Sequence, residues 1–79
     1  MPSEVQPDRT LDCVGLYCPE PVFRTRVELD KMAKGEVLEL YADDPAAEED
    51  IKRLVKRIGH ELLRFDKKEG SLRFLIRVK

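Results

Sequence analysis

The sequence lacks the features that mark a membrane protein or a nucleic-acid-binding domain. It has no tryptophan, only two tyrosines and three phenylalanines, and its 15 basic residues are balanced by 16 acidic ones to a net charge of −1. A charge so close to zero gives no general attraction to nucleic acid or to anionic membranes. No segment is long and apolar enough to span a bilayer. We therefore expect protein or small-molecule partners.

Cysteine is also scarce, since the chain has only Cys13 and Cys18. Residues 1–9 include two prolines and lack an apolar core segment, so they predict a flexible lead-in and not a signal peptide. Two cysteines without a secretory signal indicate the reducing cytoplasm, where thiols stay free. The 79 residues leave room for one domain, which we expect at residues 10–79.

Apolar periodicity and turn residues predict the order β-α-β-α-β-β. This order implies two helices packed on one face of a four-stranded mixed sheet. The first helix is expected to end at Gly35, and the second to begin with Asp44 as its N-cap and to end at Gly59. Strands are predicted at residues 10–13, 37–42, 61–66 and 72–78, the last two joined by a turn at Gly70.

The other face of the sheet is expected to remain partly open. Leu63, Phe65 and Leu75 have the strand parity that points away from the helices. These side chains predict a semi-apolar face that could dock a partner or a second copy of the chain. The alternative, scattered exposed hydrophobic residues, is at least as common.

The main chemical signal is the element Cys18-Pro19-Glu20-Pro21. If Pro19 is the first helical residue, Cys18 is the N-cap; alternatively, the helix begins at Pro21 and Cys18 lies in the preceding loop. In either case free amides, with Glu20 and Val22 as candidate donors, and the helix dipole would favour the thiolate. The Glu20 carboxylate would oppose ionisation. The alternative to a reactive thiol is a small buried hydrophobic residue.

The segment that carries this element resembles the TusA/SirA family of small sulfur-carrier proteins. The resemblance begins with the run from Leu11 to Pro21, which contains the family's CPxP element. It continues with three landmarks in order, which are Gly35-Glu36, Asp43-Asp44-Pro45 and Gly59-His60.

The resemblance implies a two-layer α/β sandwich in which Cys18 accepts a persulfide sulfur. The donor would be a cysteine desulfurase or a rhodanese-like protein, and the sulfur would pass to an acceptor protein. The pathways served include tRNA thiolation, molybdenum-cofactor chemistry and sulfur oxidation. We expect Pro19, Glu20 and Pro21 to position the thiol, and we expect no cofactor. Whether such a carrier counts as an enzyme is a matter of definition, because it turns over only with its partners.

The other candidate residues receive structural interpretations. Cys13 lies in a predicted strand and is expected in the core, although it could be a resolving thiol for Cys18. The C-x4-C spacing is not the C-x-x-C of thioredoxin-like motifs. Zinc is poorly supported, since Cys13, Cys18 and His60 lack a fourth ligand. His60 is expected to be a solvated or capping residue at a helix-to-strand turn.

Two rival functions remain open. One is a redox-sensing thiol protein with a reversible Cys13–Cys18 bond. The other is a binding module that contacts RNA or protein through basic residues. These basic residues are Lys52, Arg53, Lys56, Arg57, Arg64, Lys67 and Lys68. The four in the second helix lie near its C-terminus, where positive charge suits the helix dipole, and no aromatic residues interleave with the set. Direct nucleic-acid binding is therefore not expected.

Overall fold

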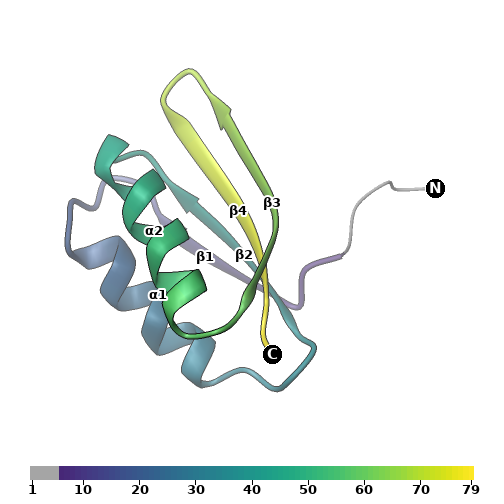
Figure 1. The fold of residues 1–79 in the computed structure, drawn as a ribbon. Coiled ribbons are helices and arrows are strands. Elements are labelled where there is room, and N and C mark those ends of the chain that lie inside the picture. The colour runs from purple at the N-terminus through teal and green to yellow at the C-terminus, as the bar shows by residue number, and fades with distance from the viewer. Residues whose placement is uncertain (1–5) are drawn as a thin grey trace.

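The computed structural model describes residues 6–79, so residues 1–5 of the expected lead-in lie outside the described part. Its elements follow the predicted order β-α-β-α-β-β (Figure 1). The helices are α1 (Glu20–Asp30) and α2 (Pro45–Arg57). The strands are β1 (Arg9–Cys13), β2 (Val37–Ala42), β3 (Glu61–Lys68) and β4 (Ser71–Arg77).

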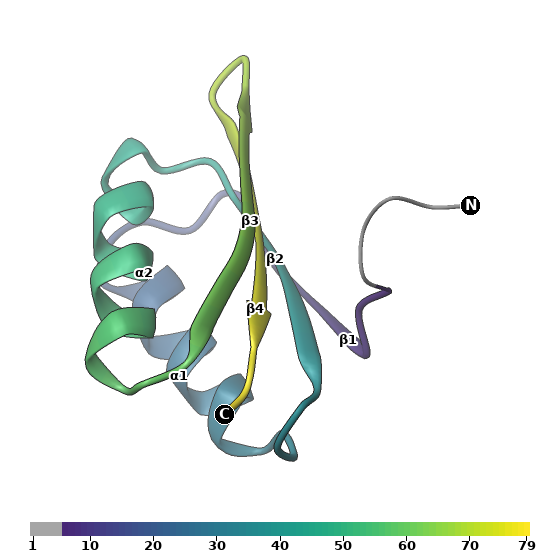
Figure 2. The ribbon, with the colours of Figure 1, turned by 45° about the vertical axis from the view of Figure 1, so that its right-hand side comes forward.

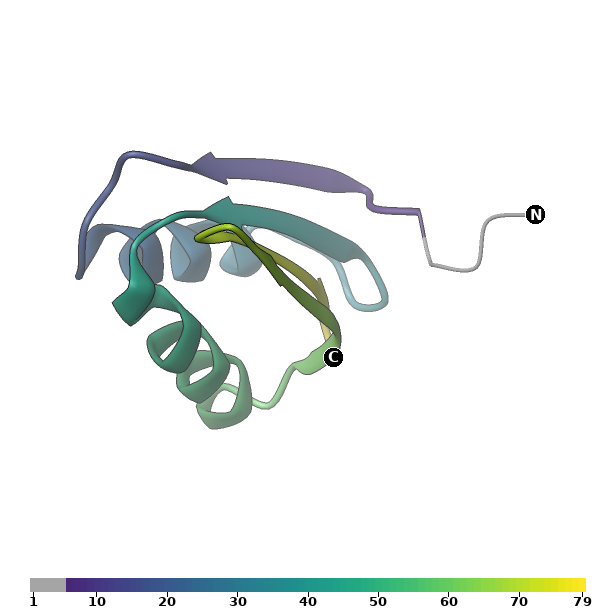
Figure 3. The same cartoon turned by 90° about the horizontal axis from the view of Figure 1, so that it is seen from above.

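The four strands form one mixed sheet in the order β1-β2-β4-β3. β1 and β2 are parallel, whereas β4 runs antiparallel to both of its neighbours. Both helices cover the same face, as the near edge-on view of Figure 2 and the view from above in Figure 3 show. The predicted two-layer α/β sandwich is therefore confirmed. Because β1 and β2 are parallel, the loops that follow them leave from the same end of the sheet.

The hydrophobic core lies between the sheet and the helices. Leu38, Leu40, Phe74 and Ile76 point from the two central strands and are fully buried. The helices contribute a stripe of apolar side chains at helical spacing, as the sequence predicted. The buried members of this stripe are Leu29, Ala47, Ile51, Leu54 and Val55.

A β-bulge in β3 overturns part of the expected face assignment. Leu62 pairs with Ile76 and Arg64 with Leu75, so Leu63 is the extra residue in the pairing. The bulge reverses the parity of the residues that follow it, and Phe65 comes to lie opposite Phe74. The two rings lie 5.0 Å apart, and Phe65 packs against the core. The prediction that Phe65 lies on the open face is wrong.

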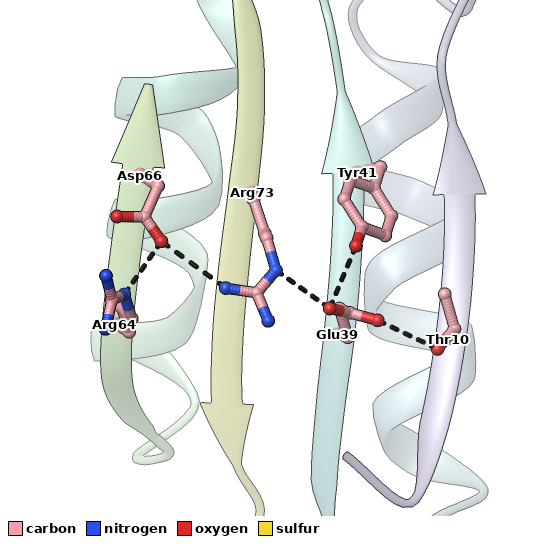
Figure 4. A network of polar contacts seen from close by, with 6 residues as sticks. All are labelled: Thr10, Glu39, Tyr41, Arg64, Asp66 and Arg73. Carbon is pink, nitrogen blue, oxygen red and sulfur yellow. Dashed lines mark hydrogen bonds and ion pairs between the residues drawn. The ribbon is translucent and has the colours of Figure 1, made fainter. Parts of the chain in front are cut away.

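The open face is polar where a semi-apolar surface was expected. Glu39 accepts hydrogen bonds from Thr10, Tyr41 and Arg73, which lie on β1, β2 and β4 (Figure 4). Arg73 also lies 3.4 Å from Asp66 on β3. Arg64 donates to the same carboxylate at 2.8 Å. Leu75, expected at this face, is only 1% exposed.

Candidate functional site

The loop between β1 and α1 is fastened to the turn between β2 and α2. The Gly15 N–H donates to Asp43 Oδ1 at 2.9 Å, and the Cys18 N–H donates to Asp44 Oδ2 at 2.8 Å. Oδ1 of the same Asp44 caps α2 by accepting from the Ala46 N–H at 3.0 Å. One aspartate therefore starts a helix and holds the backbone of the candidate nucleophile.

α1 begins between the two expected positions. Its first residue is Glu20, its N-cap is Pro19, and the Cys18-Pro19 peptide bond is cis. Both predicted registers are wrong by one residue, but Cys18 still lies just before the helix and is exposed. The Glu20 amide, expected as a donor to sulfur, donates instead to the Tyr17 carbonyl at 2.9 Å.

The Cys18 thiol faces α2, where the Asp50 carboxylate accepts a hydrogen bond from it. Cys18 Sγ donates to Asp50 Oδ2 at 3.3 Å, and Arg53 Nη1 lies 3.6 Å from Asp50 Oδ1. This hydrogen bond is the main reason that the pKa of Cys18 is raised, followed by desolvation and the charges of Asp50 and Asp44. The expected lowering of the Cys18 pKa is therefore not found in the isolated chain.

The predicted positioning residues lie next to Cys18 but do not contact its sulfur through a hydrogen bond. Pro21 is buried in the first turn of α1, where the missing N–H costs no helical hydrogen bond. Glu20 pairs with Arg24 at 3.3 Å on the exposed side of the helix. Ionisation of Cys18 is thus opposed by the carboxylates of Asp50 and Asp44, and not by Glu20 as the sequence suggested.

Sequence reasoning missed the role of Asp43 and Asp50 and recognised Asp44 only as a helix cap. A signal for Asp43 and Asp44 was present, because parallel neighbouring strands bring the loops at their carboxyl ends together. Asp50 carries no comparable signal. Its proximity to Cys18 depends on how α1 and α2 pack, which no local pattern specifies.

Two shallow grooves that share lining residues lie between α1 and α2, and Cys18 lines the smaller one. The smaller, of about 220 Å³, has Cys18 and Asp50 in its wall together with Arg53 and Arg57. The larger, of about 440 Å³, continues along α1 and includes the exposed Phe23. Both grooves share the residues Pro19, Val22, Leu54 and Arg57.

The sequence matches the family model described as Sulfurtransferase TusA over residues 9–78. The chain belongs to the TusA family. A TusA-family assignment agrees with a curated protein of Archaeoglobus fulgidus described as a candidate sulfur carrier. That protein is 54% identical over 71 residues, which cover 89% of this chain and 92% of the relative.

The TusA-family fold is also supported by a solved structure. The crystal structure of a SirA-like protein from Desulfitobacterium hafniense superposes with a TM-score of 0.77 at 22% identity. The match covers 87% of this chain and 95% of the other. At this identity, the comparison establishes the fold alone.

In this TusA-family chain, neither Cys13 nor His60 lines the groove that contains Cys18. Cys13 ends β1 with an exposed fraction of 0%, is not disulfide-bonded, and has a pKa raised mainly by burial. This confirms the expectation that Cys13 lies in the core. His60 Nδ1 accepts from the Lys79 N–H at 3.1 Å. Residues 6–79 contain no group of three or more His, Cys, Asp or Glu side chains arranged to hold a metal ion.

Several basic residues considered for a binding module have acidic partners on their own surface. Lys52 and Lys67 contact Glu48 at 3.1 and 3.5 Å, and Arg64 contacts Asp66 at 2.8 Å. Such pairing offsets the positive charge that a nucleic-acid interface would need. No helix in the described range 6–79 is long and apolar enough to cross a membrane.

Proposed function

We propose that this TusA-family protein carries sulfur as a persulfide on Cys18. The observation that carries the proposal is the contrast between the two thiols. Cys18 is exposed at the start of α1, in a groove open to a partner, whereas Cys13 is buried. The curated relative's description as a candidate sulfur carrier supports the same function.

The sulfur is received by nucleophilic attack. The Cys18 thiolate attacks the outer sulfur of a donor persulfide, so that a new S–S bond forms, the donor S–S bond breaks, and the donor leaves as its thiolate. Cys18 then bears S–SH. Because each step exchanges one S–S bond for another, no external oxidant or reductant is needed.

Delivery repeats the same exchange with Cys18 as the leaving group. An acceptor thiolate attacks the outer sulfur and releases the Cys18 thiolate, which recovers its proton. Since the surroundings of Cys18 raise its pKa, we propose that a docked partner supplies the positive charge that ionises the thiol. Pro19, Glu20 and Pro21 fix the start of α1 and thereby position Cys18.

The proposal implies two classes of protein partner and no cofactor. The donor is a cysteine desulfurase or a rhodanese-like protein, and the acceptor belongs to tRNA thiolation, molybdenum-cofactor chemistry or sulfur oxidation. Both partners act in the cytoplasm, where Cys18 stays reduced between cycles.

The test is to incubate the reduced protein with a cysteine desulfurase and cysteine and to measure intact and peptide masses. We expect the wild type and Cys13→Ser to gain one sulfur atom on Cys18 that reductant removes, and Cys18→Ser to gain none. Absence of added sulfur with several donors would overturn the proposal. A Cys13–Cys18 disulfide as the sole product would favour the redox alternative.

A further inference from the structure

The Asp50 carboxylate stands between the thiol and a guanidinium group. Its Oδ2 accepts from Cys18 Sγ at 3.3 Å, and its Oδ1 lies 3.6 Å from Arg53 Nη1. The two residues of this hydrogen bond are 32 positions apart in the sequence. The Asp44 carboxylate, which binds the Cys18 amide, and the packing of α1 against α2 bring them together. Asp50 is partly buried, which strengthens its interaction with the sulfur relative to bulk water.

The carboxylates that affect Cys18 come from α2 and not from α1. On α1, Glu20 is paired with Arg24 of the same helix. From α2, the N-cap Asp44 and Asp50 both raise the pKa of Cys18. Their combined effect favours the neutral S–H, which can donate the observed hydrogen bond.

Loading with sulfur reverses this balance. An S–SH group is more acidic than an S–H group, because the adjacent sulfur stabilises the anion, so we expect the loaded form to carry more negative charge at neutral pH than the empty form. The anion has no proton to donate to Asp50, and the two negative charges repel each other. The added sulfur lies about 2 Å beyond Sγ. Arg53 and Arg57, from the wall of the same groove, are the nearby groups of opposite charge.

We propose that Asp50 is a positioning residue that distinguishes the empty thiol from the loaded persulfide of Cys18. It holds the neutral thiol through the hydrogen bond and turns the persulfide anion away, toward Arg53 and Arg57. The empty and loaded carriers thereby present different groove surfaces to donor and acceptor proteins. This inference rests on the proposed function, since it concerns the persulfide state of Cys18.

The first test needs no sulfur donor and therefore separates this inference from the proposed function. The rate of Cys18 alkylation by iodoacetamide is followed across pH by mass spectrometry of the Cys18 peptide. We expect Asp50→Asn to react severalfold faster than the wild type at pH 7, with the midpoint of its pH profile at lower pH. Glu49→Gln removes an exposed charge from the neighbouring position and should keep the wild-type profile. An unchanged midpoint in Asp50→Asn would overturn the inference.

The second test compares the two states directly. The Asp50 carboxyl carbon is observed by ¹³C NMR in the reduced protein, in the protein loaded chemically with polysulfide, and in Cys18→Ala, which has no donor. We expect the loaded form to resemble Cys18→Ala and to differ from the reduced form. An Asp50 signal that is the same in the reduced and loaded forms would contradict the inference, even if desulfurase loading succeeds. Chemical loading keeps this result independent of any partner protein.

Discussion

Asp44 contributes both to the stability of α2 and to the position of Cys18. One carboxylate oxygen caps α2 through the Ala46 amide, and the other holds the Cys18 amide. Removing the side chain leaves both N–H groups without their acceptor. The stability of α2 and the geometry of the loop that carries Cys18 therefore depend on the same group.

We expect Asp44→Ala to lower the free energy of unfolding by about 1 kcal/mol, as for the loss of an N-cap, with a further loss from the Cys18 amide. Asp44→Asn retains one side-chain oxygen, whereas the two hydrogen bonds of Asp44 use one oxygen each, so its stability should fall between those of Asp44→Ala and the wild type. Urea unfolding measures all three, and Glu49→Ala on the same helix provides the control. Equal stability of the Asn and Ala variants would argue against the dual role.

At the scale of the residue, the sequence predicted which of the two cysteines would be exposed, but not the electrostatic surroundings of its thiol. The position of Cys18 ahead of a proline-rich helix start follows from local rules of helix capping. The pKa of the thiol depends instead on Asp50, which is remote in sequence. Local patterns describe the amide groups and the dipole of one helix, whereas the carboxylates that raise the pKa of Cys18 come from the other helix and its N-cap.

At the scale of the elements, the hairpin of β3 and β4 was likewise predicted only in part. Both strands and the turn at Gly70 were predicted. The connecting loop was expected at residues 67–71, but it contains only two residues, because Lys68 pairs with Ser71. Glu69 and Gly70 have φ values of +50° and +82°, as a type I′ turn requires. The bulge at Leu63 was not predicted, since a strict alternation of strand parity has no place for an extra residue.

We expect Gly70→Ala to destabilise the protein by about 1 to 2 kcal/mol, because an L side chain is disfavoured at positive φ. Apart from the residue itself and its two chain neighbours, no atom lies within 4 Å of the added Cβ, so the loss has a backbone origin. Gly70→Asn should cost less, and Glu69→Asn should stabilise the hairpin, because asparagine tolerates this conformation. Thermal unfolding of the three variants tests the order, and a Gly70→Asn as unstable as Gly70→Ala would contradict it.

For the whole molecule, hydrogen bonds and ion pairs on the open face of the sheet link all four strands. Desolvation raises the pKa of Glu39, but hydrogen bonds from Arg73, Tyr41 and Thr10 outweigh it, and the net pKa is lowered. The hydrogen bond from Arg64 similarly lowers the pKa of Asp66. Both carboxylates therefore favour the folded state when they are ionised.

The contribution of Glu39 to stability is fully present above its unfolded pKa of about 4.3 and is lost as the pH falls through its lower folded value. We expect Glu39→Gln to be less stable than the wild type at pH 7 and to lose less stability on acidification. Urea unfolding at several pH values from 7 to 3 measures how the free energy of unfolding of the variant and of the wild type depends on pH, with Glu49→Gln as the control. Parallel pH dependence of Glu39→Gln and the wild type would show that the network does not contribute to acid sensitivity.

The Asp44 carboxylate also links the opening of the first turn of α2 to the release of the loop that carries Cys18. If the first turn of α2 opens, the Cys18 amide loses its acceptor together with the Ala46 amide. Both amides should then exchange their hydrogen for deuterium through one common opening, with similar protection. The loop that carries Cys18 should therefore open together with the first turn of α2, although Cys18 and Asp44 are 26 positions apart in the sequence.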